Sequence, residues 1–330
     1  MKFDNKEILI EYYFQNSLKL VDKQPLVSAI ILNYNRSEAT LKCIESLKTS
    51  SYPSLEVIVV DNCSKQESFD FLKENVKFLD VLLIRINKNI GYAGGNNVGI
   101  RNAKGNYLLI LNDDVTVSSE LVTGLSEIAQ GDKTIGIVGP LTYYGKTNEV
   151  WAYPPTIAFS NHAVLDVPFV MGAAFMIKRD VIAKIGLLDE NFFLYHEELD
   201  WCIRARNAGY RVVCAVNLKA WHHVPSLEVT KYSANEVYYV NRNYFIIAAK
   251  HFRSGGAWIG FLFKNIIYSK ENKEFIFLFL PTALKNKKYT ASKSYISAIV
   301  VGMVYFLKFM ARDPLRYDIP FFGERMEYRS

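Results

Sequence analysis

Several chemical motifs are absent from this sequence, and each absence removes a class of proteins. The glycine-rich segment at 89–105 has neither the G-x-G-x-x-G spacing of a dinucleotide-binding loop nor the G-x-x-x-x-G-K-[ST] pattern of a P-loop. The zinc-hydrolase motif H-E-x-x-H fails at its last position, which is Asp200. Only four cysteines occur, with no C-x-x-C pair, and we expect Cys43, Cys202 and Cys214 to be buried, reduced thiols.

The sequence also has no signal-peptide pattern and no long apolar run. The N-terminal stretch MKFDNKEILIEYYF carries acidic residues and no apolar core segment, and the apolar stretch before Lys308 is too short to span a bilayer comfortably. We therefore expect a cytoplasmic protein. Half of the 330 residues are hydrophobic, which predicts a packed globular core. The formal net charge of +6 suits an anionic ligand or a membrane surface without requiring either.

Apolar, β-branched runs alternate with segments of helical periodicity over the first 140 residues. The runs at 26–35, 55–62, 81–87, 106–114 and 134–140 predict buried strands, and the segments 37–53, 68–76 and 119–130 predict helices. Strands that are hydrophobic on both faces and alternate with helices indicate an α/β fold with a mostly parallel central sheet flanked by helices.

Polar residues follow one predicted strand after another. Asn33 and Asn35 end the first strand, Asp61 lies at the end of the second, and Asp113 and Asp114 end the fourth. Ligands of parallel sheets bind beyond the carboxyl ends of the strands, so these residues predict a site. Two adjacent carboxylates after a buried strand indicate either a turn or a bound cation.

Two further polar groups lie in the second half of the chain. Glu197, Glu198 and Asp200 open a predicted helix, where the helix dipole alone favours acidic residues. His222 and His223 close a strand, and because neighbouring residues on a strand point to opposite faces, at most one of them faces a common site.

Four separated segments, taken in order, resemble family 2 glycosyltransferases with the GT-A nucleotide-sugar-binding fold. They are VSAIILNYNRSEATLKCIESLKTSSYPSLEVIVVDNCS, NIGYAGGNNVGIRNAKGNYLLILNDDV, MGAAFMIKRDVIAKIGLLDENFFLYHEELDWCIRARNAGY and AWHH. The resemblance covers about residues 26 to 245. GYAGGNNVGI and YYVNRNYFII resemble more closely the bacterial rhamnosyltransferase-like branch of surface polysaccharide synthesis.

The resemblance implies a role for each polar group. The nucleotide-sugar donor would be bound by Asn33, Asn35, Asp61, Asn89, Gly91, Gly95, Asn96, Asn97 and Asp113. Asp114 would hold Mg²⁺ or Mn²⁺ together with Asp113 and His222, with His223 as the alternative ligand, although Asn112 replaces the first Asp of the family's D-x-D-like motif. Glu198 would be the general base of an inverting transfer, supported by Glu197 and Asp200.

The predicted domains are an N-terminal helical segment at 1–25, the GT-A domain at 26–230 and a helical C-terminal extension at 231–330. The extension is aromatic and basic, and it either packs on a domain or partner chain or lies on the cytoplasmic membrane face. The predicted function is transfer of a sugar, rhamnose favoured, from a dTDP or UDP donor to a lipid-linked or polysaccharide acceptor. We expect no nucleic-acid partner, and a homodimer is possible.

Two alternative functions remain open from the sequence. A sugar nucleotidyltransferase would need a basic, glycine-rich loop after the first strand, and LNYNRSEAT contains only Arg36 and no glycine. A non-catalytic nucleotide-binding or assembly subunit would be expected to have lost the base or the acidic pair, and Asp113, Asp114 and Glu198 are all present.

Overall fold

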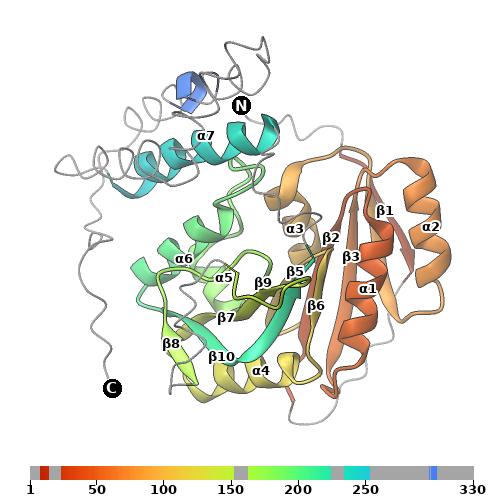
Figure 1. Cartoon of the computed structure of the whole chain (residues 1–330), viewed down its shortest axis with the longest axis horizontal. Coiled ribbons are helices and arrows are strands. Elements are labelled where there is room, and N and C mark those ends of the chain that lie inside the picture. Colours follow the sequence, from red (N-terminus) through yellow and green to blue (C-terminus); the bar gives the residue numbers. More distant parts are fainter. Residues whose placement is uncertain are drawn as a thin grey trace. The chain divides into compact units, whose positions relative to one another are not determined.

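The computed structural model describes residues 8–14, 24–151, 163–223, 234–252, 297 and 299–302 (Figure 1). The described residues form two compact units. The first contains the residues up to Phe193 and those from Glu197 to 223, and the second contains Leu194–His196 and the residues from 234 onward. Most of the C-terminal extension predicted at 231–330 lies outside the described residues.

The first unit is built on one ten-stranded sheet. Its strands are β1 Ile10–Phe14, β2 Val27–Asn33, β3 Leu55–Asn62, β4 Val81–Ile86, β5 Tyr107–Asn112, β6 Val115–Val117, β7 Ile135–Tyr144, β8 Val164–Asp166, β9 Ala174–Lys178 and β10 Arg211–His222. They lie in the order β1-β4-β3-β2-β5-β9-β7-β10-β6, and β8 pairs with β10.

Six strands run in the same direction, which confirms the mostly parallel sheet predicted from the sequence. β4, β3, β2 and β5 are paired in parallel, and so are β7 and β10. β9 lies between these two groups and is antiparallel to both β5 and β7. The strands β1, β6 and β8 pair antiparallel to their neighbours.

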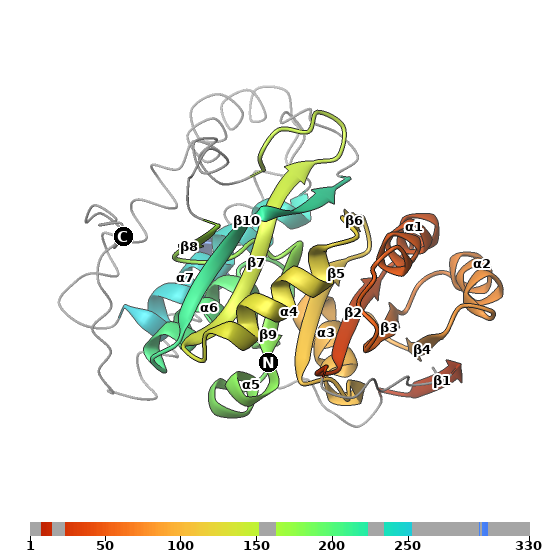
Figure 2. The same ribbon diagram turned by 90° about the horizontal axis from the view of Figure 1, so that it is seen from below.

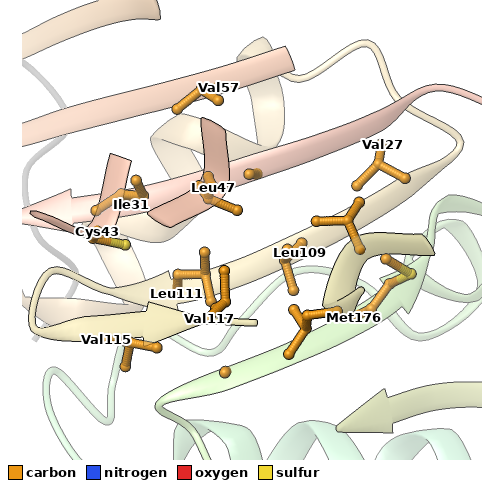
Figure 3. Close-up of a cluster of buried hydrophobic side chains, with 14 of the residues drawn as sticks. Val27, Ile31, Cys43, Leu47, Val57, Leu109, Leu111, Val115, Val117 and Met176 are labelled. Atoms are coloured by element: carbon orange, nitrogen blue, oxygen red, sulfur yellow. The ribbon is translucent and has the colours of Figure 1, made fainter. Parts of the chain in front are cut away.

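Helices cover both faces of the sheet, as Figures 1 and 2 show. The helices of the first unit are α1 Ser37–Lys48, α2 Gln66–Val76, α3 Gly91–Asn102, α4 Leu121–Gly131, α5 Arg179–Ile185 and α6 Glu197–Asn207. The buried residues of α1, α2 and α4 belong to one hydrophobic cluster, part of which Figure 3 shows around Leu47, Leu109 and Met176. Those of α3, α5 and α6 belong to a second cluster on the opposite face.

Helix α3 packs unusually close to the sheet because glycines face it. A Cβ atom at Gly95 would lie 2.3 Å from a side-chain carbon of Leu32, and one at Gly99 would lie 2.4 Å from a side-chain carbon of Ile30. A side chain at either position would require the side chain of Leu32 or of Ile30 to move. The close approach at Gly95 is therefore to the protein's own strand.

One element departs from the sequence prediction. The segment 1–25 was predicted to be helical, but its residues Ile10–Phe14 form strand β1, which pairs with β4. Glu11 lies opposite Arg85 in this register, and Tyr13 packs edge-on against Phe69 at a centroid distance of 5.0 Å. These contacts with residues far along the chain, and not the local periodicity, decide the structure of this short segment.

The second unit contains helix α7, Ala234–His251, and the tripeptide Leu194–His196. Ile246, Ile247 and Ala248 of α7 are fully buried. A described helical turn at 299–302 approaches this helix closely, since a Cβ atom at Gly302 would lie 2.4 Å from the ring of Phe245. None of the helices described here has the length and apolar character that crossing a bilayer requires.

Candidate active site

The predicted polar residues lie at one edge of the sheet because the strands that carry them are parallel and in register. Asn33 at the end of β2 is paired with Asp61 of β3 on one side, and Leu32 is paired with Asn112 of β5 on the other. The chain therefore brings the ends of three strands together, as the sequence predicts.

The acidic pair Asp113–Asp114 forms the turn between β5 and β6. Because β6 pairs antiparallel with the end of β10, Val115 lies opposite His222. The His222 Nε2 atom lies 3.0 Å from Asp114 Oδ1, and both side chains are buried. His223 points elsewhere and shares a hydrogen bond of 2.8 Å with the Thr116 hydroxyl. Of the two histidines, His222 is the one beside the acidic pair.

Arg36 lies beside the acidic pair, although no sequence motif assigned it to a cation site. Its Nη2 atom lies 2.9 Å from Asp114 Oδ2, and its Nη1 atom lies 3.6 Å from Asp113 Oδ1. Arg36 immediately precedes α1, three residues after Asn33 at the end of β2. Its position as the basic residue directly after the first strand end was the only signal in the sequence.

The two carboxylates differ in their electrostatic surroundings. Burial raises the pKa of Asp113 to about 7, with Arg36 opposing the shift and Asp114 adding to it. Burial also acts to raise the pKa of Asp114, but its contacts with His222 and Arg36 outweigh burial and hold that pKa below its usual value. Asp114 is therefore the carboxylate that stays ionised at neutral pH.

The donor atoms around Asp114 fit a divalent cation in part. Asn112 Oδ1 and His222 Nδ1 are buried and have no hydrogen-bond partner, and the buried Asp114 Oδ1 lies 3.0 Å from the other nitrogen of His222. Within the described ranges, however, no three His, Cys, Asp or Glu side chains converge into a site that would hold a metal ion by themselves. Carboxylate and imidazole are ligands that Mg²⁺ and Mn²⁺ accept, but the remaining ligands would have to come from another molecule.

Asn33 and Asp61, predicted to contact the donor, are fully buried and bonded to each other. The Asn33 amide donates to Asp61 Oδ1 at 2.7 Å and its oxygen accepts from the Thr40 hydroxyl at 3.0 Å. Burial raises the pKa of Asp61, against the opposing effect of bonds from Ser64 and Asn33. Their hydrogen bond joins the end of β2 to the end of β3 at the polar edge of the sheet.

Tyr34 and Asn35 directly follow Asn33, in the loop after β2. Asn35 has a φ of 58°, a left-handed conformation that Asn tolerates, and its side-chain oxygen accepts from the backbone of Lys65 at 2.7 Å. Tyr34, which stands between Asn33 and Asn35 in the chain, is 46% exposed. The sequence pattern gave no role to Tyr34, whose ring is open to a flat ligand such as a base.

The predicted glycine and amide residues occupy the start of α3 and its second turn. Asn89 accepts from the backbone of Gly91 at 2.9 Å and from the Asn62 amide at 3.1 Å. Asn96 and Asn97 lie inside the helix and not at its first turn. The Asn97 amide bonds both backbone groups of Leu188, so its polar atoms are committed to the fold.

The acidic residues of α6 have three different environments. Glu197 is buried, and burial together with the charges of Glu198 and Asp200 raises its pKa well above the usual value. Asp200 is fully buried and lies 2.8 Å from Arg204, whose guanidinium also donates to the Leu187 carbonyl. Glu198 is half-buried, and its carboxyl carbon would lie 3.2 Å from a Cβ atom at Gly172. Of the three, Glu198 has the surroundings of an accessible carboxylate.

Tyr92 connects the two acidic groups. Its hydroxyl donates to the Gly172 carbonyl at 2.9 Å. Burial raises its pKa, and the charges of Glu197, Glu198 and Asp113 raise it further. The backbone N–H of Asn112 donates to the Ala173 carbonyl at 2.9 Å, and the Glu198 carboxyl group lies beside Gly172, so the end of β5 and the start of α6 both approach this segment. Nothing in the sequence pattern distinguished Tyr92 from a core aromatic residue.

The chain enters α6 through a strained backbone. Phe193, Tyr195 and His196 have φ values of 63°, 70° and 70°, which bulky L-residues rarely adopt. Such residues cost about 1–3 kcal/mol each and gather at functional sites. The strain lies immediately before Glu197 and Glu198.

This sheet with its polar edge has the GT-A fold of glycosyltransferases. The chain is similar to a mannosyltransferase from Pyrobaculum calidifontis solved with GDP-Man and Mn²⁺, with a TM-score of 0.57, 16% identity and coverage of 87% of this chain and 90% of that one. It is also similar to residues 1–349 of S. aureus TarS in complex with UDP-GlcNAc, with a TM-score of 0.57, 13% identity and coverage of 85% and 81%.

Sequence comparison shows which proteins the chain is similar to. The profile described as "Glycosyl transferase family 2" matches residues 28–186. The low-salt glycan biosynthesis hexosyltransferase Agl10 of Haloferax volcanii is 29% identical over 237 residues, which cover 67% of this chain and 74% of that protein. The amylovoran biosynthesis glycosyltransferase AmsB of Erwinia amylovora is 25% identical over 225 residues, which cover 64% and 74%.

Proposed function

We propose that this protein is a metal-dependent, inverting hexosyltransferase of cell-surface glycan synthesis. It transfers a sugar from a nucleoside-diphosphate donor to a lipid-linked or polysaccharide acceptor. The observation that carries the proposal is the placement of two unlike acidic groups beside the segment Gly172–Ala173: the pair Asp113–Asp114, which follows β5, and Glu198 of α6. The first suits the leaving group and the second suits the attacking hydroxyl.

At the donor end, Asp114 and His222 would hold Mg²⁺ or Mn²⁺, with Asp113 beside them. A cation bound there would neutralise the negative charge that develops on the departing diphosphate. The buried, unpartnered atoms Asn112 Oδ1 and His222 Nδ1 beside Asp114 support this role, and the diphosphate itself would supply the ligands that the protein does not. The Mn²⁺ in the mannosyltransferase complex supports the same choice of metal.

At the acceptor end, Glu198 would accept the proton of the attacking hydroxyl. A general base must be ionised at the working pH and must reach the hydroxyl that it deprotonates. Glu197 fails the first requirement because its pKa is raised well above the usual value, and Asp200 is held by Arg204. We therefore assign the role of the base to Glu198.

The nucleoside would bind at the ends of β2 and β3. We assign direct contacts to Asn35 and the exposed ring of Tyr34, and a supporting role beneath them to Asn33 and Asp61. Asn89 and Gly91 would approach the diphosphate at the start of α3. Gly95, Asn96 and Asn97 would shape the site through packing of the helix, since Leu32 fills the space beside Gly95.

Only similarity to other proteins indicates which sugar and which nucleotide base the donor contains. Rhamnose rests on the resemblance of two segments to rhamnosyltransferases, whereas the names of the relatives and solved structures include a hexosyltransferase, GDP-Man and UDP-GlcNAc. Cell-surface glycan synthesis rests on the names of the Haloferax and Erwinia relatives. Peripheral contact with the cytoplasmic membrane face and a homodimer remain predictions, and most residues of 231–330 lie outside the described ranges.

A donor panel tests the proposal. The purified protein is incubated with dTDP-rhamnose, UDP-glucose, UDP-GlcNAc or GDP-mannose, with Mn²⁺ and with a lipid-linked oligosaccharide preparation as the hydroxyl acceptor, and release of nucleoside diphosphate is measured. We expect turnover of at least one donor, its loss with chelator, and a decrease of at least about 100-fold in Glu198→Gln. Full activity of Glu198→Gln would remove Glu198 from the mechanism, and absence of turnover with every donor would contradict the proposed function.

A further inference from the structure

Helix α7 carries three consecutive buried polar residues that the proposed reaction does not use. Asn241, Arg242 and Asn243 are 1%, 7% and 0% exposed, in a segment otherwise rich in aromatic and aliphatic residues. Buried polar groups are retained at a cost unless their hydrogen bonds fix a structure. The contacts of Asn243 show what these residues fix.

Asn243 forms hydrogen bonds with the backbone of the tripeptide Leu194–His196. Its Nδ2 atom donates to the Leu194 carbonyl at 2.8 Å and to the Tyr195 carbonyl at 2.6 Å, which uses both amide protons. Its Oδ1 atom accepts from Nε and Nη2 of Arg242 at 2.9 Å and 2.6 Å. Arg242 thereby fixes the orientation of the amide, because only the oxygen can face a guanidinium.

A second residue of the tripeptide is bound to the same helix. The His196 ring bonds the backbone of Val240, and it stacks on Tyr244 with a centroid distance of 4.4 Å. All three residues of Leu194–His196 are therefore attached to one turn and a half of α7. This attachment explains why the tripeptide belongs to the second unit although both its neighbours along the chain belong to the first.

The attached tripeptide is also where the backbone is strained. Tyr195 and His196 both have φ values of 70°, and neither is glycine. Bulky residues keep such a conformation only where surrounding contacts enforce it. The next residue along the chain is Glu197, the first of α6, followed by Glu198. Release of the tripeptide would relax these dihedral angles and turn the first residues of α6.

We propose that Asn243 is a positioning residue for Glu198: by binding the Leu194 and Tyr195 carbonyls, it maintains the strained conformation of Tyr195 and His196 that sets the direction of the base. This inference rests on the proposed function of Glu198. Asn243 touches neither substrate nor metal in this scheme and acts only through the backbone. The C-terminal extension then has a part in catalysis that does not depend on membrane binding.

The decisive variant is Asn243→Asp, with Asn235→Ala as the matched control. Aspartate has nearly the same volume and keeps the acceptor that Arg242 uses, but it cannot donate to the two carbonyls. Asn235 is an exposed residue of the same helix. Asn243→Ala tests loss of the whole side chain, and circular dichroism checks the fold of each variant.

Two readouts separate positioning from a merely structural role. With the donors of the panel and Mn²⁺, we expect kcat of Asn243→Asp to fall about 10- to 100-fold, with KM for the donor changed less than about twofold and the pH profile of kcat shifted. Hydrogen exchange of the amides at 194–199 should become faster in Asn243→Asp and stay unchanged in Asn235→Ala.

Wild-type kcat and wild-type exchange in Asn243→Asp would overturn the inference. So would a fall in kcat with an unchanged pH profile and unchanged exchange, because the effect would then be a general loss of stability. If the wild-type protein turns over no donor, the proposed function fails, and faster exchange at 194–199 would still support the attachment of the tripeptide by Asn243.

Discussion

Asp114 lies between two unlike groups: its Oδ2 atom is 2.9 Å from Arg36 Nη2, and its Oδ1 atom is 3.0 Å from His222 Nε2. A carboxylate held this way stays ionised in spite of burial. Arg36 thus compensates the acidic pair when no other cation is bound, and it competes with any cation that binds there.

Replacement of Arg36 by Ala should tighten Mn²⁺ binding in the absence of nucleotide. The side chain of Arg36 is 37% exposed, so solvent screens its charge, and we expect a change of about threefold to tenfold in Kd. Calorimetric titration with Mn²⁺ measures it, with Arg101→Ala as the control for loss of an exposed arginine. Unchanged or weaker binding in Arg36→Ala would show that Arg36 does not compete for the site.

Glu197→Gln should stabilise the protein at neutral pH. Because the folded-state pKa of Glu197 is raised, the unfolded chain releases its proton above about pH 4.5 while the folded chain keeps it, so stability is lost as pH rises. Gln cannot ionise and does not lose this stability. Thermal melting should show a higher Tm for the variant at pH 7, with the difference shrinking toward pH 4.5. A lower Tm at pH 7 would mean that Glu197 is ionised.

Asp200→Asn should reduce stability more than it reduces chemistry. Asp200 is fully buried against Arg204, and removing one partner of a buried ion pair costs about 3 kcal/mol. Urea denaturation measures the loss, and Asp70→Asn on the surface of α2 should change the free energy of unfolding by less than about 0.5 kcal/mol. A stable but inactive Asp200→Asn would instead give Asp200 the role of a supporting acid.

The buried His196 should make the free energy of unfolding decrease in acid. Burial lowers its pKa to about 4, below its ordinary 6.5, so between these values the unfolded chain binds a proton that the folded chain does not. The free energy of unfolding should fall as pH decreases through this window, by up to about 1.4 kcal/mol per pH unit from this residue.

His196→Phe keeps a ring against Tyr244 and removes the titration. The difference in unfolding free energy between pH 7 and pH 5 should therefore be smaller in the variant than in the wild-type protein, as urea denaturation at the two pH values would show. The other titrating groups contribute equally to both proteins. Equal differences would mean that His196 is protonated in the folded state.

Much of the fold was predictable because burial on both faces leaves a clear pattern. The run at 55–62 matches β3 at both ends, and the other four predicted strands lie within a few residues of β2, β4, β5 and β7. The strands β1, β6 and β8 are short and lie at edges or beside distant segments, so pairing decides them more than local sequence does.

The site was predictable in residue type and place, but not in contacts. Strand ends located Asp114 and Asp61, and the resemblance to a family supplied their roles. Pairing of β6 with β10 joins Val115 to His222 across 107 positions of chain, and no local pattern reports it. Contacts between residues far apart in the chain also bring Arg36 and Tyr92 to the site. They exclude the Asn97 amide from direct contact with a ligand, because it is bonded to Leu188.

The most direct test of this account is metal-dependent nucleotide binding at Asp114. The purified protein is titrated calorimetrically with UDP, dTDP and GDP, each with and without Mn²⁺, and the titrations are repeated with Asp114→Ala and with Asp80→Ala as an exposed control. The account predicts that one nucleotide binds only with Mn²⁺, that binding disappears in Asp114→Ala and that Asp80→Ala behaves like the wild-type protein. Wild-type binding by Asp114→Ala, or no binding of any nucleotide by a folded protein with Mn²⁺ present, would contradict it.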